Sequence, residues 1–460
     1  MTATAVRTSS GAKQKPLILL SAFPGDGHTL PLITIAAHLV KTGYEVAFIT
    51  TPKFGQKVED IGAEWIHTEN PFTEALMQRM QEAGSLPLGL ERLAVEMKHV
   101  FFDSLPARTV KTEETLAMLQ ARDPGRQIIF MEDVFNWSFL PFQLGRPLPR
   151  GFSTLPKSIG FGVAALIIES QDTGPITLGL PPDTTDSGRH RNKVLHELVE
   201  KTLMKPALES LQESLRETGC TTIPSRNMFR AAYTAHDATI QLCSPSLEYP
   251  LSDLPPSVHF SGVLPRKAAD SDYKYPSWWP EVERTREDSK YRHVVFVSQG
   301  TVTHDYSELV LPTIRAFADR DDVLVVATLG SREAQLPADF TLPPNARVIN
   351  YVPYDTILEY TDVFVSNGGY GALMHSVRNG VPTILAGESQ EKTEVIMRAV
   401  YAGLGVSLAT QTPSAEQIRK GVEQILKDSK FKKAAVRLRI ENENLNALAR
   451  IEAMVKDLTI

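Results

Sequence analysis

The chain has 460 residues, of which 42% are hydrophobic and 22% are charged, and its formal net charge at pH 7 is −6. This composition is typical of a folded globular protein, and the length exceeds what a single hydrophobic core usually supports. We therefore expect two domains of roughly 200 residues each, with a cleft between them. The negative charge and the lack of a Lys- and Arg-rich run disfavour binding to nucleic acids or to anionic membranes.

Three features predict a cytoplasmic protein. The apolar stretch Leu17–Leu20, which follows a Thr-, Ser- and Ala-rich start, is too short for the core of a signal peptide. No window approaches the roughly 20 apolar residues that are needed to span a bilayer. We interpret Cys220 and Cys243 as free thiols, because a chain of this size needs no disulfide.

The first half of the chain is predicted to begin with a βαβ unit. Its expected elements are a strand at Leu17–Leu20, a turn at Pro24–Gly27, a helix over 29–42 and a strand at Glu45–Thr50. Another strand, Gln127–Met131, leads into Asp133. Because the carboxyl ends of parallel strands share one edge of a sheet, we expect His28 and Asp133 to lie close together there.

A histidine in this place can act as a general base when an acid orients it and stabilises the imidazolium, which is the role open to Asp133. The alternatives are a solvent-bonded histidine at a helix start and an aspartate that caps a helix. A dinucleotide site at Gly25 and Gly27 is disfavoured, because Leu30 occupies the third glycine position.

The second half predicts another doubly wound pattern. Its expected elements are strands at 293–298, 323–328, 347–351, 363–366 and 383–385, and helices at 307–318, 355–360, 372–378 and 393–401. We predict a first domain over 16–263, an interdomain linker over 264–290, a second domain over 291–440 and a C-terminal helix within 441–460 that packs back on the first domain. Within the linker, Trp278 and Trp279 are expected at the domain junction. Both domains are α/β, Rossmann-like and doubly wound, and they face a central cleft.

Two strand ends of the second half predict a diphosphate site. Ser366-Asn367-Gly368-Gly369-Tyr370-Gly371 joins a strand to a helix, and its glycines allow several backbone N–H groups to approach one anion. Ser298-Gln299-Gly300-Thr301 offers hydroxyl groups and a glycine at the neighbouring edge. The alternative is two ordinary glycine-containing turns.

The chain resembles glycosyltransferase family 1 over nearly its whole length. The segments that carry the resemblance are these two loops together with Gly27-His28-Thr29-Leu30-Pro31-Leu32 and Gly380-Val381-Pro382. Members of this family are UDP-glycosyltransferases of GT-B fold, and the fungal and bacterial members that act on natural products of secondary metabolism are the most similar. The resemblance implies that His28 is the catalytic base and that Asp133 orients it. It places the nucleotide base beside Tyr351 and Val352, where Tyr351 stacks on uracil, and the donor sugar beside Glu391 and Lys392.

The sequence departs from the family's pattern in three places. Asn367 replaces the usual histidine before the glycines, Glu391-Lys392 replaces an Asp-Gln pair, and Gly371-Ala372 stands where many members have Ser or Thr. Asn367 supplies no positive charge, so stabilisation of the leaving group is expected to depend on backbone N–H groups, the following helix dipole and Thr301.

The resulting hypothesis is an inverting, metal-independent O-glycosyltransferase that moves a hexose, glucose in the first instance, from a UDP-sugar to a small hydrophobic acceptor. No cofactor is expected, because no Asp-x-Asp element or cluster of His and carboxylate residues adjoins the diphosphate loops. The acceptor is predicted to be phenolic or polyketide, with a terpenoid or sterol as the alternative, and to contact Phe101, Phe135, Trp137 and Phe152. Two other functions stay open, a noncatalytic binding or helper protein of GT-B fold and a UDP-sugar epimerase.

Overall fold

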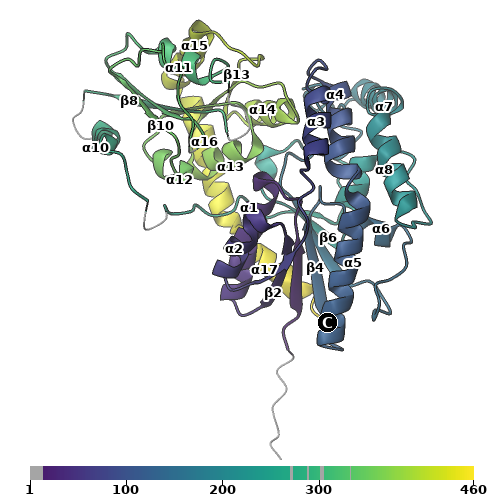
Figure 1. The fold of residues 1–460 in the computed structure, drawn as a ribbon. Helices are drawn as coiled ribbons and strands as arrows, with labels where there is room; N and C mark the ends of the chain where they lie inside the picture. Colours follow the sequence, from purple (N-terminus) through teal and green to yellow (C-terminus); the bar gives the residue numbers. More distant parts are fainter. Residues whose placement is uncertain (1–13, 270–272, 287–289, 301–304, 332) are drawn as a thin grey trace, which may run out of the picture.

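The computed structural model describes residues 14–269, 273–286, 290–300, 305–331 and 333–460. It contains two parallel sheets, one above the other in Figure 1. The first sheet has the strand order β3-β2-β1-β4-β5-β6-β7. Its strands are β1 (Leu17–Ser21), β2 (Glu45–Thr50), β3 (Glu64–His67), β4 (Ile128–Asp133), β5 (Lys157–Gly162), β6 (Ala238–Gln241) and β7 (Val258–Phe260). We call the part of the chain around this sheet the first domain.

The second sheet has the order β10-β9-β8-β11-β12-β13, and the part of the chain around it is the second domain. Its strands are β8 (His293–Ser298), β9 (Val323–Thr328), β10 (Ala346–Ile349), β11 (Val363–Ser366), β12 (Thr383–Leu385) and β13 (Gly405–Ser407). In both sheets the order reverses beside the first strand of the domain, which is the topological switch point of a doubly wound fold. The predicted α/β architecture of two doubly wound domains is therefore confirmed.

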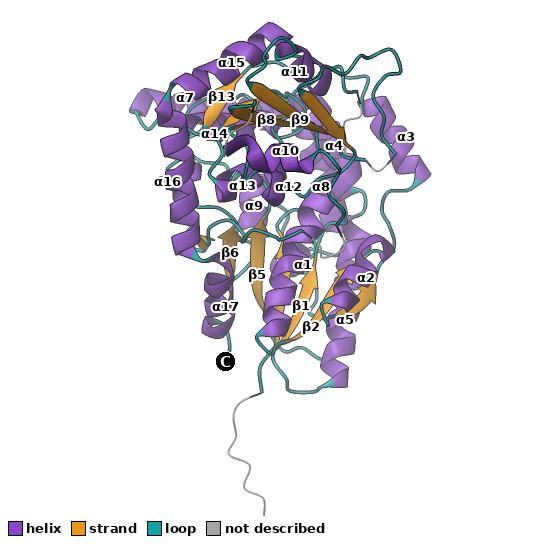
Figure 2. Cartoon of the chain, turned by 90° about the vertical axis from the view of Figure 1, so that its left-hand side faces the viewer, coloured by secondary structure: helices purple, strands orange, loops and turns teal. Residues whose placement is uncertain are grey.

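Helices cover both faces of each sheet (Figure 2). Those of the first domain are α1 (Asp26–Lys41), α2 (Pro52–Asp60), α3 (Glu74–Ala83), α4 (Leu90–Met97), α5 (Leu105–Arg122), α6 (Leu140–Gln143), α7 (Asp186–Lys201), α8 (Lys205–Glu217) and α9 (Met228–Tyr233). Those that follow are α10 (Trp279–Glu283), α11 (Val310–Ala316), α12 (Tyr354–Ile357), α13 (Tyr370–Asn379), α14 (Lys392–Tyr401), α15 (Ala415–Lys427), α16 (Ser429–Leu445) and α17 (Ala447–Asp457). None of these helices is long and apolar enough to cross a membrane.

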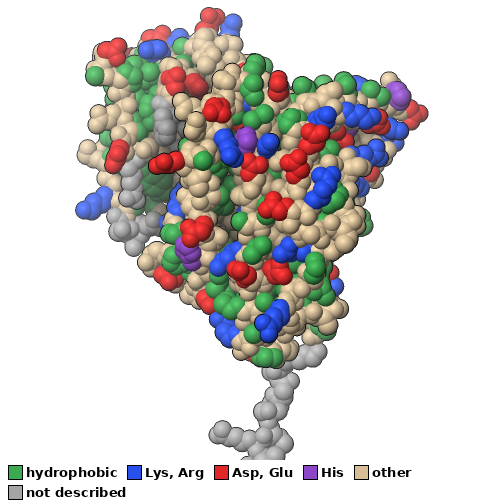
Figure 3. Space-filling model, turned by 45° about the vertical axis from the view of Figure 1, so that its right-hand side comes forward, with side chains coloured by type: hydrophobic (Ala, Val, Ile, Leu, Met, Phe, Trp, Pro, Cys, Tyr) green, Lys and Arg blue, Asp and Glu red, His purple; other side chains and the backbone are tan. Residues whose placement is uncertain are grey.

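Side chains of β1 alternate between the two faces of the sheet, so this strand packs against helices on both faces. Ile18 and Leu20 pack with α1 and α17, whereas Leu17 and Leu19 pack with α5 on the opposite face. All five residues of β1 are buried, as expected for a central strand of a parallel sheet. On the outer surface, acidic and basic side chains are interspersed across the face shown in Figure 3.

The end of the chain ties the domains together. Helix α16 packs on α13 of the second domain, and α17 then lies against α1 of the first domain (Figures 1 and 2). Ile451 and Val455 of α17 are fully buried in the core of the first domain, and His38 on α1 lies 3.1 Å from the Glu452 carboxylate. The last two helices therefore connect the second sheet to the first.

The two tryptophans of the predicted linker do not lie at the domain junction, where the sequence predicted them. Trp279 is buried with Val282, Val294 and Phe296, which all belong to the second domain, and Trp278 packs against the same cluster. The tryptophans therefore stabilise one face of the second sheet rather than the domain junction, because α10 folds back over that sheet.

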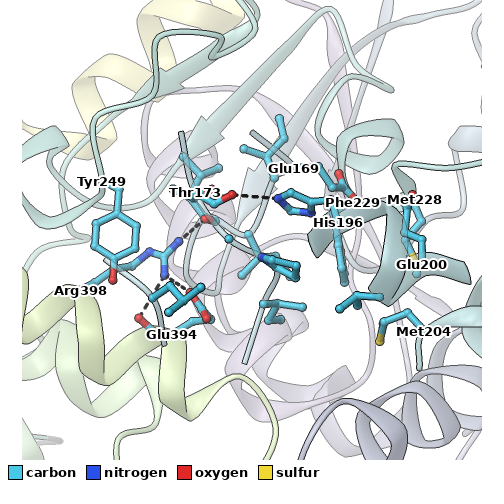
Figure 4. A pocket seen from close by; sticks show the side chains of 18 residues that line it. Glu169, Thr173, His196, Glu200, Met204, Met228, Phe229, Tyr249, Glu394 and Arg398 are labelled. Carbon is cyan, nitrogen blue, oxygen red and sulfur yellow. Dashed lines mark hydrogen bonds and ion pairs between the residues drawn. The ribbon is translucent and has the colours of Figure 1, made fainter. Parts of the chain in front are cut away.

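The junction itself contains a buried ionic cluster around Arg398 of α14. The Arg398 guanidinium donates to the carboxylates of Glu248, from the first domain, and of Glu394, at 2.7 Å, and to the backbone oxygen of Leu166. Its charge also lies 4.5 Å from the centre of the Tyr249 ring (Figure 4). All three charged side chains are less than a tenth exposed. One arginine thus neutralises carboxylates from both domains.

We expect Arg398→Met to lower the free energy of unfolding by ~3–5 kcal/mol, because it leaves two buried carboxylates without a cation. Urea denaturation followed by tryptophan fluorescence measures the loss. The matched control is Lys420→Met, which removes an exposed i, i+4 ion pair with Glu416 and should change the free energy by less than about 0.5 kcal/mol. Equal effects of the two substitutions would contradict the assigned role of Arg398.

Candidate functional site

His28 and Asp133 meet at the carboxyl edge of the first sheet. His28 is the third residue of α1, and Asp133 is the last residue of β4, which pairs in parallel with β1. The His28 Nδ1 and Asp133 Oδ1 atoms are 3.0 Å apart. Backbone N–H groups of Phe23 and Phe135 also donate to the Asp133 carboxylate, at 2.7 and 2.9 Å. These bonds hold the carboxylate in one orientation, so that it fixes the histidine ring in turn.

The surroundings of His28 suit a base. The Asp133 carboxylate accepts a hydrogen bond from the Nδ1–H group, which leaves Nε2 with the lone pair that a base needs. The side chain is 24% exposed, whereas Asp133 is completely buried. Burial acts to lower the pKa of His28, but the charge of Asp133, its hydrogen bond and the charge of Glu391 outweigh burial and the opposing charge of Arg108. The pKa of His28 is therefore raised above 6.5.

Aromatic rings surround this pair on the side of the first domain. The centres of the Phe101 and Phe135 rings lie 6.1 and 6.0 Å from that of His28, as expected for residues beside an acceptor. Two other predicted acceptor residues are not in this place. Trp137 is 1% exposed and packs edge-on against Phe102 in the core, while Phe152 packs against the opposite face of the sheet with α5. Both side chains serve packing instead.

Sequence reasoning missed two neighbours of the pair. The Phe23 ring centre is 5.5 Å from that of His28, and the Arg108 guanidinium lies 5.3 Å from the centre of the Phe23 ring. Burial lowers the pKa of Arg108 to about 10, so it stays a cation near neutral pH. Phe23 is the second residue after β1, and this position beside the strand end could have indicated it. Arg108 comes from α5, and only the tertiary structure brings it there.

The two predicted diphosphate loops lie side by side in the second domain. Ser298 of β8 pairs with Ser366 of β11, and the Asn367 side chain donates to the backbone oxygen of Gln299. Gly300 and Gly368 have φ angles of +75° and +81°, which favour glycine. A Cβ atom on Gly371 would meet nothing within 4 Å, so the start of α13 is open. The loops therefore form one glycine-rich edge beside a helix N-terminus.

Several side chains of this edge are already engaged. The Tyr370 hydroxyl accepts a hydrogen bond from Gln241 across the domain junction, and the Ser298 hydroxyl accepts one from the Gly300 N–H at 3.1 Å and bonds to that of Tyr354. Among the predicted nucleotide-binding residues, the glycines offer only backbone groups, and so does Tyr370, whose buried side chain is bonded to Gln241. The Val352 side chain is fully buried in the second domain, the Tyr351 side chain is 57% exposed, and Thr301 lies outside the described residues.

Helix α14 begins with the two residues that are predicted to contact the donor sugar. Glu391 is its N-cap residue and Lys392 its first residue. The charge of Glu391 contributes to the raised pKa of His28, which belongs to the other domain. The predicted base and the predicted donor-sugar residue Glu391 are therefore close enough to interact electrostatically across the two domains.

A separate cavity of about 30 Å³, room for about one water molecule, lies where the loop around Thr173 meets α14 (Figure 4). Its polar side chains bond one another or the backbone: His196 Nε2 is 3.0 Å from the Thr173 oxygen, and Glu169 accepts from the N–H groups of Phe229 and Arg230. Burial raises the pKa of Glu169 to about 7. None of the predicted site residues lines this cavity, which adjoins the ionic cluster of the domain junction.

Known proteins similar to the chain match it over most of its length. It is 35% identical to UDP-glucosyltransferase 1 of Beauveria bassiana over 95% of this chain and 94% of that protein. The chain belongs to the UDP-glycosyltransferase family. It is also 33% identical to UDP-glucosyltransferase A1 of Starmerella bombicola, over 98% of this chain and 94% of that protein. This glycosyltransferase matches the family described as Erythromycin biosynthesis protein CIII-like, C-terminal domain, over residues 313–455.

Solved structures show the same fold. The glycosyltransferase of kitacinnamycin aligns with a TM-score of 0.69 at 18% identity, over 97% of this chain and all of the other. The calicheamicin glycosyltransferase aligns with a TM-score of 0.64 at 18% identity, over 97% of this chain and 98% of the other. This UDP-dependent glycosyltransferase therefore has the GT-B fold, and the family resemblance expected from its motifs is confirmed.

We expect Asp133→Asn to lower the pKa of His28, because the amide removes the negative charge that opposes the effect of burial. A nuclear magnetic resonance titration of the imidazole measures this pKa. Asp26→Asn is the matched control, since Asp26 lies on the same helix but faces Lys53 at 2.9 Å, and it should leave the pKa of His28 unchanged. An unchanged pKa in Asp133→Asn would show that the carboxylate does not act on the base.

Proposed function

We propose that this UDP-dependent glycosyltransferase moves a hexose, glucose in the first instance, to a hydroxyl group of a small hydrophobic acceptor, with inversion at the anomeric carbon. The observation that carries the proposal is the 3.0 Å contact between His28 and Asp133, and the charge of Glu391 at the start of α14 acts on the same histidine. This contact provides an oriented base in the first domain, and the loops that follow β8 and β11 provide a glycine-rich edge in the second.

The proposed reaction is a single displacement. His28 Nε2 takes the proton of the acceptor hydroxyl while that oxygen forms a bond to the anomeric carbon of the donor. The bond between this carbon and the oxygen of the diphosphate breaks, and UDP leaves with the electron pair from the opposite face. An α-linked donor then yields a β-glycoside. Asp133 stabilises the imidazolium that forms, and such base catalysis contributes ~10²–10⁴-fold to the rate.

Backbone groups are proposed to hold the diphosphate. A Cβ atom on Gly300, Gly369 or Gly371 would meet no atom closer than 3.8 Å, which leaves room for an anion beside the N–H groups at the start of α13. Ile396 fills the space beside Gly368, which can contribute only its backbone. Thr301 completes this set in the proposal. Tyr351 is proposed to stack on uracil beside the backbone of Val352, which its exposed ring permits. No divalent metal and no cofactor take part.

The names of relatives support the choice of substrates. Four of the relatives that are at least 30% identical over most of the chain are called UDP-glucosyltransferases, and the similar protein of Lentzea aerocolonigenes is called 4'-demethylrebeccamycin synthase. The rings of Phe23, Phe101 and Phe135 around His28 suit a flat, aromatic acceptor. We therefore propose a phenolic or polyketide acceptor before a terpenoid or sterol.

The first test compares ligand binding with catalysis. UDP at 100 times its dissociation constant should stabilise the fold by ~2.7 kcal/mol in thermal unfolding, and NAD at the same concentration should have no effect. His28→Ala should keep this response to UDP but lower transfer from UDP-glucose to phenolic acceptors by ~10²–10⁴-fold. A response to NAD alone would reject the donor assignment, and normal transfer by His28→Ala would reject the mechanism.

The second test is the pH profile. Only neutral His28 can take a proton, and its pKa lies above 6.5, so kcat/KM should fall as pH drops through that raised pKa. Asp133→Asn should transfer more slowly, and the acidic limb of its profile should move to lower pH because its His28 pKa is lower. Asp26→Asn should keep the limb where it is. A limb that does not move in Asp133→Asn would mean that another group titrates.

A further inference from the structure

The described residues of the two proposed diphosphate loops, 298–300 and 366–371, include no charged side chain. Asn367 is neutral, and its amide already donates to the Gln299 oxygen. Departing UDP gains negative charge, and a nearby cation stabilises that charge more strongly than neutral donors do. Among the described residues, a cation at this edge must therefore come from another segment of the chain.

The aliphatic part of Lys392 lies along the edge. A Cβ atom placed on Gly368 would be 3.6 Å from Lys392 Cβ, and one placed on Gly387 would be 3.0 Å from Lys392 Cδ. The backbone oxygen of Asn367 is also close to Gly387. Lys392 thus packs against the loop that follows β11, and only 7% of the residue is exposed.

The Lys392 ammonium has capacity to bind another group. Its Nζ donates to Ser389 Oγ at 2.8 Å, which uses one of three donors. Within the described ranges, no carboxylate lies within 4.0 Å of it. The acids that act on it from further away are Glu391, Glu308 and Glu96, and two of these have partners. Glu96 accepts from Arg92 at 2.7 Å, and Glu308 accepts from Gln411 at 2.8 Å.

Acids of both domains act on the charge of the Lys392 ammonium. Glu96 belongs to α4 of the first domain, whereas Glu308 and Glu391 belong to the second. Glu391 acts on His28 as well as on Lys392. The side chain of Lys392 thus packs beside Gly368 and Gly387, and acids of both domains act on its charge. A buried cation that lacks a directly paired carboxylate favours a negatively charged ligand.

We propose that Lys392 Nζ binds an anionic oxygen of the nucleotide sugar and supplies the positive charge that Asn367 lacks. The proposal rests on the proposed donor site. In this proposal Lys392 binds an anionic oxygen, whereas the sequence predicted that it contacts the donor sugar. The anionic oxygen can come from the β-phosphate, which we favour because Lys392 packs on Gly368, or from a carboxylate on the sugar.

The test is isothermal titration calorimetry of the full chain with UMP, UDP, UDP-glucose and UDP-glucuronate. Lys392→Met keeps the aliphatic packing and removes the charge. Loss of one charge-assisted hydrogen bond should weaken binding of UDP and UDP-glucose by ~10- to 100-fold and leave UMP binding unchanged. Lys392→Arg should retain most of the affinity. Lys420→Met, on the exposed surface of α15, is the matched control and should bind all four ligands as the unaltered protein does.

The outcomes separate the alternatives. Weaker binding of UDP-glucuronate alone would identify a sugar carboxylate as the partner, and unchanged binding of all four ligands by Lys392→Met would overturn the proposal. If Lys392→Met does not fold, Lys392→Gln against Lys392→Arg makes the same comparison, and equal UDP affinity in those two would overturn it. Failure of the unaltered protein to bind UDP would instead reject the proposed function, so the two failures are distinguishable.

Discussion

The parallel pairing of β1 with β4 is the constraint on which the rest of the site depends. Ser21 pairs with Glu132, so the next residue of β4, Asp133, reaches the turn that leads from β1 into α1. Its carboxylate accepts a hydrogen bond from the backbone N–H of Phe23 in that turn and another from His28 in the first turn of α1. A shift of one residue in this register would turn Asp133 to the other face of the sheet and separate it from the histidine.

The second sheet repeats this arrangement with a different chemical result. Ser298 and Ser366 pair at the ends of β8 and β11, and glycines follow both strands. Where the first sheet places an acid and a base at its switch point, the second places small residues and a helix N-terminus. One fold used twice therefore provides the proposed place of proton transfer and the proposed place of the anion.

Helix α14 connects these two edges to the domain junction. Its first turn carries Glu391 and Lys392 towards the cleft, and about 10 Å further along the helix Arg398 is bound to Glu248 of the first domain. The junction combines this ionic cluster with a hydrophobic cluster that contains residues of both domains, such as Val263 and Leu373, and both sets of contacts favour one relative position of the domains. The geometry of the cleft thus depends on contacts that take no part in the proposed reaction.

The sequence by itself determined the two-domain architecture, the central strands, His28, Asp133 and the glycine loops, because local periodicity and strand-end position specify these features. It did not indicate β5, whose Lys157–Gly162 segment contains two glycines and no clear alternation. Only the tertiary structure decided that Trp137 is core, that Phe23 and Arg108 join the base, and that Lys392 lies on Gly368. Such contacts join residues far apart in the chain, and side-chain packing rather than local pattern selects them.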